Sequence, residues 1–235
     1  MPDFAVLEKI LTSALQLSRR PVAVAFRETP PPGVEKFTGS VPSGCSFWRL
    51  AAGGRAFYTV PSDHHNCPVG SYTHNIPLPA GSQPDLTQTL SLMSDIGYIR
   101  MEEVPSIPRL AATPAIAVYA PLGATPVDPD AVVISGRPGR MMLLHEAAIR
   151  SDRKTLPMLG RPTCMAIPAA LSGSLASSLG CIGNRVYTDA ADDEFYTVVA
   201  GRDLSSVMAQ LETIVSANEV LAEYHRDRRA SLATL

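Results

Sequence analysis

Residues 21–26 read PVAVAF and residues 115–120 read AIAVYA, and these two short apolar runs begin two similar halves of the chain. Runs of this length that are rich in valine and aromatic residues are typical of buried strands. Each run is followed by a cysteine, a second cysteine in a glycine-rich turn, a Tyr-Thr pair and an Ala-Gly segment ahead of Asp-Leu. We therefore consider, as a hypothesis, that residues 21–100 and 115–215 are degenerate pseudo-repeats.

The remaining hydrophobic pattern predicts an α+β protein. Three further apolar runs predict strands at residues 55–60, 131–135 and 194–201. Apolar residues at helical spacing predict helices at residues 4–15, 85–97, 138–150 and 169–180, and from residue 203 onward. Because strands and helices alternate too irregularly for a doubly wound sheet, we expect one domain over residues 1–235, with a mixed or antiparallel sheet flanked by helices.

The composition of the 235-residue chain excludes several classes of protein. Apolar residues make up 46% of it, as in a globular protein. Its net charge of -2 lacks the basic excess of a nucleic-acid or membrane-surface binder. No apolar run approaches the ~20 residues that cross a bilayer, and the N-terminus lacks the basic start of a signal peptide. We expect a cytoplasmic protein without nucleic-acid or membrane partners. The sequence does not decide whether it forms a homo-oligomer.

Four cysteines, Cys45, Cys67, Cys164 and Cys181, are the main chemical feature. A reducing compartment disfavours a structural disulfide framework. No pair has the two-residue spacing of zinc ribbons, but glycines beside three of the cysteines allow a close backbone approach, and Cys67 precedes a proline as cluster ligands often do. We predict that the four are metal ligands of an iron–sulfur cluster, with zinc as the alternative. The competing interpretation is that they are small buried hydrophobes.

Residues 63–74 read DHHNCPVGSYTH, which is rich in histidine around Cys67. We predict that His64, His65 and His74 are catalytic acid/base groups or tune the metal centre. Neighbours on an extended chain face opposite ways, so at most one of His64 and His65 should point into the site. The alternative is a solvated surface loop.

Residues 180–188, GCIGNRVYT, predict a second part of the site. Asn184 and Arg185 follow two glycines and could cradle a small anionic molecule, with Arg185 as the forked donor. Trp48, three residues after Cys45, could cover a cofactor. The segment lacks the Walker lysine and the full dinucleotide glycine pattern, so it does not predict nucleotide binding.

The order of short motifs resembles one known family. These motifs are PVAVAF, GCSFW, GGRAFYTV, NCPVG, SIPRL, PDAVVIS, TCMAIP and SLGCIGNRVYT. Together they resemble the uncharacterised ArCR proteins over about residues 7–215. The resemblance implies a soluble prokaryotic protein of one fold whose recurring cysteines match the four cysteines of this chain. It implies no activity.

These observations predict a cytoplasmic cysteine-ligated metalloprotein, with an iron–sulfur cluster and a redox or small-molecule-transforming role. Two alternatives stay open. One is a thiol-redox protein in which Cys45 pairs with Cys67 and Cys164 with Cys181. The other is a non-catalytic small-molecule binding module whose cysteines only pack. The sequence does not decide whether the protein is an enzyme.

Overall fold

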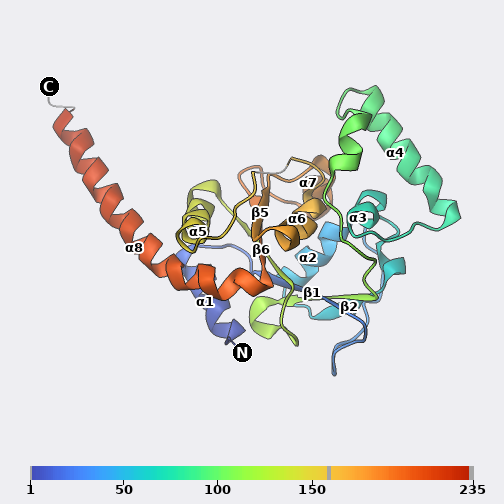
Figure 1. Cartoon of the computed structure of the whole chain (residues 1–235), viewed down its shortest axis with the longest axis horizontal. Coiled ribbons are helices and arrows are strands. Elements are labelled where there is room, and N and C mark those ends of the chain that lie inside the picture. The colour runs from blue at the N-terminus through green and yellow to red at the C-terminus, as the bar shows by residue number, and fades with distance from the viewer. Residues whose placement is uncertain (1, 158–159, 233–235) are drawn as a thin grey trace.

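The computed structural model describes residues 2–157 and 160–232, and within them six strands form one sheet (Figure 1). Across the sheet the strands lie in the order β2 (Phe57–Thr59), β3 (Ile116–Pro121), β1 (Val22–Arg27), β4 (Ala131–Gly136), β6 (Phe195–Ala200) and β5 (Leu175–Ser178). Every neighbouring pair is antiparallel. The prediction of a single-domain α+β fold with an antiparallel sheet is confirmed.

Helices cover both faces of the sheet because successive strand residues point into two different cores. Along β1, Val24 joins one core and Ala23 joins the other. The helices of the first core are α2 (Gly44–Ala52) and α6 (Ala166–Ser172). The helices of the second core are α1 (Phe4–Ala14), α5 (Pro138–Arg150) and α8 (Gly201–Leu232). The sheet is therefore the middle layer of three.

Further helical segments lie between these elements. They are η1 (Pro61–His64), α3 (Pro68–Thr73), η2 (Ala80–Ser82), α4 (Gln83–Asp95), η3 (Met101–Ser106), η4 (Leu122–Ala124), η5 (Thr163–Met165) and α7 (Ile182–Thr188). α4 and the outer part of α8 project from the body on opposite sides (Figure 1). No described helix combines the length and the apolar composition that a membrane span requires.

The sequence misassigned one helix. Residues 169–180 were expected to form a small-residue helix, but α6 ends at Ser172 and strand β5 follows from Leu175. All four residues of β5 are buried and pair with β6. Pairing with a buried strand outweighs the helix propensity of alanine in this segment. The short helices α2 and α7 were not predicted.

The sheet is built of two triplets with the same strand order. Outward from its centre, β1 is followed by β3 and β2, and β4 is followed by β6 and β5. The central strands β1 and β4 pair antiparallel, as a two-fold axis normal to the sheet would require. The duplication stays a prediction. Its expected bounds, 21–100 and 115–215, divide the strands unequally, whereas the strand order relates residues 22–121 to residues 131–200.

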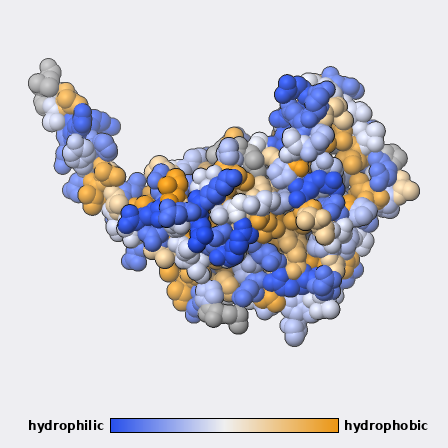
Figure 2. Space-filling model, in the orientation of Figure 1, coloured by the Kyte–Doolittle hydropathy of each residue, from blue (hydrophilic) through white to orange (hydrophobic). Residues whose placement is uncertain are grey.

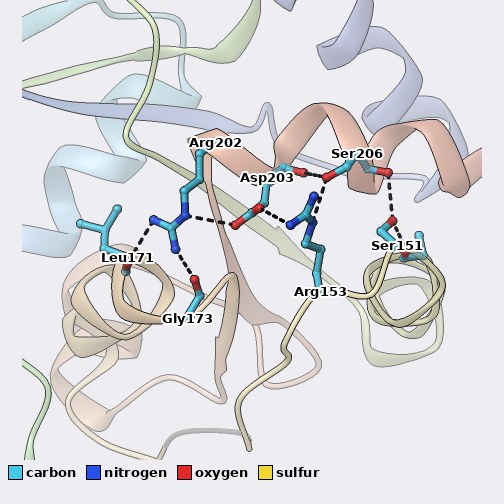
Figure 3. Close-up of polar contacts among 8 residues, drawn as sticks. Ser151, Arg153, Leu171, Gly173, Arg202, Asp203 and Ser206 are labelled. Atoms are coloured by element: carbon cyan, nitrogen blue, oxygen red, sulfur yellow. Dashed lines mark hydrogen bonds and ion pairs between the residues drawn. The ribbon is translucent and has the colours of Figure 1, made fainter.

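A network of polar contacts fixes the first turn of α8 (Figure 3). The buried carboxylate of Asp203 forms ion pairs with Arg153 (Nη1 to Oδ1, 3.2 Å) and Arg202 (Nε to Oδ2, 3.4 Å). Arg202 also donates to the carbonyl oxygens of Leu171 and Gly173 at the end of α6. The start of α8 is thereby held against the loops that follow both α5 and α6.

Gly201, the first residue of α8, is expected to tolerate no side chain. A Cβ at this position would lie 1.7 Å from the carbonyl oxygen of Pro129, and the Gly201 amide donates to the Asp130 carbonyl over 2.7 Å. Because the obstacle is backbone, we expect Gly201→Ala to lower the free energy of unfolding by about 3 kcal/mol in urea denaturation. Gly139→Ala in α5 is the matched control, since nothing lies within 4 Å of its Cβ position. Equal stability of the two variants would contradict the close approach.

Candidate metal centre

Four short helical segments each present one cysteine to a common region. Cys45 lies in the first turn of α2, Cys164 lies in η5 before α6, and Cys67 and Cys181 immediately precede α3 and α7. Burial, and then the neighbouring thiols of Cys164, Cys67 and Cys181, raise the pKa of Cys45 well above its usual value. The structure thus brings all four predicted ligands close enough to influence one another's ionisation.

The two halves of the chain interlock at this region. α3 packs against η5, and α7 packs against α2. Thr73, at the end of α3, lies close enough to Cys164 to favour its thiolate, although burial dominates and raises the pKa of Cys164. The Asn184 amide in α7 acts on Cys45 in the same way. Neither half could therefore form the site alone.

Two backbone amides point at the sulfur of Cys67. The amide of Gly70 donates to Sγ over 3.3 Å, and a Cβ on Gly70 would lie only 2.8 Å from that sulfur. The amide of Gly44, at the start of α2, is the second donor. Burial raises the pKa of Cys67 and these amides lower it. Amides directed at sulfur favour the thiolate, which is the form that binds metals.

The other cysteines differ in exposure. Cys45 and Cys164 are buried, and burial raises the pKa of both. Cys67 and Cys181 are half-buried, and all four are free thiols in this structure. Neutral buried thiols are poor nucleophiles. Within residues 2–157 and 160–232, no three histidine, cysteine, aspartate or glutamate side chains are grouped to hold a single metal ion.

His64 is a buried, neutral histidine next to α2. The Thr59 hydroxyl donates to the carbonyl of Ala117 (3.3 Å), so Thr59 Oγ1 accepts from His64 Nε2 over 2.8 Å. The ring packs against Phe47 at 4.9 Å, and its Nδ1 lies 4.0 Å from the position of a Cβ on Gly44. Burial lowers the pKa of His64 to about 3, assisted by His74 and His65. His64 is thus the member of the predicted pair that faces inward, and His65 is half-exposed.

His74 is buried beside His64, with the ring centroids 5.9 Å apart. Its Nδ1 donates to the carbonyl of Gly70 over 3.0 Å, while its Nε2 is buried without a hydrogen-bond partner among the described residues. Burial lowers the pKa of His74. Gly70 thereby links His74 to Cys67, since its carbonyl accepts from His74 and its amide donates to the Cys67 sulfur.

Asn184 and Trp48 lie beside Cys45, and the cofactor-binding role that the sequence predicted for them stays a prediction. Asn184 is 2% exposed, and neither polar atom of its amide has a hydrogen-bond partner of good geometry within the described structure. The amide nevertheless lies near enough to favour ionisation of both Cys45 and Tyr196. Trp48 packs edge-on against Tyr196 at 5.7 Å.

Arg185, predicted to hold an anion, bonds to backbone carbonyls in this structure, and its role toward an anion stays a prediction. Its guanidinium donates to the backbone carbonyls of Ala191 (2.5 Å), Leu179 (2.5 Å) and Glu194 (3.2 Å). These contacts fasten the loops on either side of α7. These three bonds shape the loop that carries Cys181 and leave Nε and one hydrogen of Nη1 without a printed acceptor.

A cavity adjoins Cys45, Trp48 and Tyr196. Its volume of about 20 Å³ leaves room for one water molecule. Three arginines, Arg19, Arg20 and Arg49, are among the residues that line it. Arg19 and Arg20 have carboxylate partners, whereas Arg49 makes no ion pair within the described ranges.

Several residues around the thiols were not predicted. They include Thr73, which lies beside Cys164, and Thr163, whose hydroxyl accepts from the amide of Cys181 over 2.7 Å. Gly44 and Thr163 each directly precede a cysteine and each contact the cysteine of the following turn. The Tyr-Thr pair after the second cysteine of each half was the available signal, and it was used only as a landmark of duplication.

Comparison with known proteins gives a family and no activity. The family model described as uncharacterised ArCR matches residues 10–210. The matched range includes every strand of the sheet and all four cysteines. No curated protein and no solved structure matches the chain.

Proposed function

The chain belongs to the uncharacterised ArCR family, and we propose that it is a metalloprotein whose four cysteine thiolates hold an iron–sulfur cluster. The observation that carries this proposal is that four cysteines from four separate segments, and from both triplets of the sheet, lie near enough for three of them to raise the pKa of Cys45. Within the described residues they are not grouped as ligands of a single ion, so holding a cluster would require the segments to move closer together. Free cysteines that only pack in the core need not lie near one another, whereas the ligands of one metal centre must.

The residues around the thiols fit such a cluster. Four thiolates are its usual ligand set, and hydrogen bonds to the sulfurs tune its potential. The Gly44 and Gly70 amides directed at Cys67 are bonds of this kind. The unpartnered amide of Asn184 and the unpartnered Nε2 of His74 are buried polar atoms, which are costly unless something bonds to them. When bound, the cluster would supply one-electron transfer.

The high pKa of the buried thiols is compatible with this assignment. Metal binding requires thiolates and releases their protons. The positive charge of the metal offsets the cost of burying the negatively charged thiolates. Without a cation, Cys45 and Cys164 stay neutral, which argues against the thiol-redox alternative. Zinc is the second candidate because it also accepts four thiolates.

We place the approach of a small anionic molecule at the cavity beside Cys45. Arg49 lines this cavity and has no carboxylate partner within the described structure, whereas three of the five donors of Arg185 already bond to carbonyls. The cavity must widen before it admits more than a water molecule. A redox or transforming role toward such a molecule belongs to this proposal.

Metal analysis of the full chain, purified without oxygen, tests the proposal. We expect about four iron and four sulfide per chain and broad visible absorption that bleaches on exposure to air. Stoichiometric zinc in a colourless protein would indicate a zinc centre in place of the proposed cluster. Four titratable thiols without metal would leave a binding module with packed cysteines, and oxidation to disulfides in the native fold would support the thiol-redox alternative.

A further inference from the structure

A second cavity lies where the start of α4 approaches α3. Its volume of about 180 Å³ compares with about 20 Å³ for the cavity beside Cys45, and the two share no lining residue. The helix α4 projects from the body at this place (Figure 1), and Figure 2 shows apolar surface along the projection. The cavity has room for several water molecules and therefore for a small organic molecule. The residues that line it are Pro68, Tyr72, Ile76, Pro77, Leu78, Gln83, Leu86 and Arg109.

The lining combines an apolar surface with a few polar groups. Its prolines, its isoleucine, its leucines and the ring of Tyr72 form the apolar part. The Tyr72 hydroxyl donates to the carbonyl of Val104 over 3.2 Å, and the Gln83 amide donates to the carbonyl of Leu78 over 3.1 Å. Arg109 is the one charged residue among the described residues that line the cavity. Sites for small molecules have this composition, in which a few polar groups fix the orientation of a ligand that packs on apolar side chains.

Arg109 is held in place with part of its fork of N–H donors free. Its Nε donates to the carbonyl of Tyr72 over 2.9 Å, and its Nη2 donates to the side-chain oxygen of Asn75 over 2.7 Å. The guanidinium carbon lies 4.3 Å from the centroid of the Tyr72 ring. The remaining hydrogens, on Nη1 and Nη2, have no protein acceptor within the described ranges, and no carboxylate pairs with them there.

The free edge of Arg109 is suited to a carboxylate. The two terminal nitrogens of a guanidinium match the two oxygens of a carboxylate and bind them with parallel hydrogen bonds. Because two hydrogen bonds and an aromatic ring already fix the Arg109 side chain, it loses little further freedom when a ligand binds. An exposed arginine on a flexible stem would lack this advantage.

We propose that this cavity binds a small monocarboxylate with an apolar body, whose carboxylate pairs with Arg109 and whose body packs on the apolar lining. A volume of 180 Å³ is below that of sites for drug-sized molecules, which favours a compact ligand. An inorganic anion would leave the apolar lining uncovered. Pro68 directly follows Cys67, so the ligand would lie beside the candidate metal centre, but the inference does not depend on a cluster.

Calorimetric titration of the full chain with 3-phenylpropionate and with hexanoate tests the site. We expect saturable binding of at least one acid. The uncharged amide of the same acid should bind at least about tenfold more weakly, because it cannot form charge-assisted hydrogen bonds with the arginine. Propionate should also bind at least about tenfold more weakly, because it has almost no apolar body to bury.

Replacing Arg109 locates the binding. Arg109→Gln should weaken binding of the acid at least about tenfold, and Arg109→Lys should weaken it less, because lysine keeps the charge and loses the fork. Arg100→Gln is the matched control, since Arg100 is an exposed arginine that pairs with Glu103 and does not line the cavity. Circular dichroism checks that the three variants remain folded.

Three results would overturn the proposal. One is the lack of saturable binding of either acid up to about 10 mM, where the binding free energy of so small a ligand becomes negligible. The second is equal affinity of the unmodified protein for the acid and for its amide. The third is an equal effect of Arg109→Gln and Arg100→Gln on the affinity for the acid.

Discussion

Cys67→Ser is expected to remove the metal centre from a protein that remains folded. Cys67 receives the Gly44 and Gly70 amides, and its sulfur lies between the start of α2 and the start of α3. A serine hydroxyl is a poor replacement for a thiolate ligand, and changes to groups that merely support a ligand already cost 10–100-fold in metal affinity. We therefore expect iron per chain to fall by more than about tenfold in protein purified without oxygen.

Variants within the same loop provide the controls. His65→Asn should retain full iron, because His65 is half-exposed. His74→Asn should reduce iron without abolishing it, because His74 reaches Cys67 only through the Gly70 peptide. Gly70→Ala should lower the iron content while the protein remains folded, since its Cβ would displace the end of the Cys67 side chain. Full iron loading in Cys67→Ser would show that Cys67 is not a ligand of the metal and would contradict the proposed site.

The strands were predictable because burial on both faces leaves a simple signal. PVAVAF and AIAVYA became β1 and β3 almost residue for residue, since each contributes side chains to more than one hydrophobic cluster, β1 to the two main cores and β3 to the first core and a small third cluster. β5 was not predictable. Its sequence Leu-Ala-Ser-Ser has no strand pattern of its own, and it is a strand only because β6 pairs with it.

The site was predictable in its residue types and not in its geometry. Four cysteines with glycine neighbours indicated a common centre, and the order of landmarks in the two halves indicated how loops distant in sequence could meet. Arg185 shows the limit of this reasoning. Its sequence context matches an anion cradle, but whether a guanidinium faces a cavity or three carbonyls depends on the path of the loop. The arginines at the cavity come from α2 and from the segment after α1, where no motif marks them.

The buried histidines couple the candidate site to folding stability. His64 is 4% exposed, bonds to Thr59 and stacks on His74. Its pKa is lowered to about 3 by burial and by the neighbouring histidines, against about 6.5 in an unfolded chain. Between these two values the unfolded chain binds a proton that the folded chain does not, so stability must fall as pH decreases. Burial lowers the pKa of His74 as well, which acts in the same direction.

His64→Gln is therefore expected to flatten the acid side of the stability profile. At about 1.4 kcal/mol per pH unit, His64 alone should lower the free energy of unfolding of the unmodified protein by about 3 kcal/mol between pH 6.5 and pH 4, and by at most about 5 kcal/mol on reaching pH 3. Glutamine can still donate to Thr59 but does not take up a proton in this range, so the variant should start less stable at pH 7 and lose correspondingly less on acidification. Urea denaturation at each pH measures both, and His225→Gln on the exposed end of α8 should follow the unmodified protein. If His64→Gln and the unmodified protein lost equal stability on acidification, His64 would be protonated in the folded protein at mildly acidic pH. The interpretation of His64 as a buried neutral histidine would then be wrong.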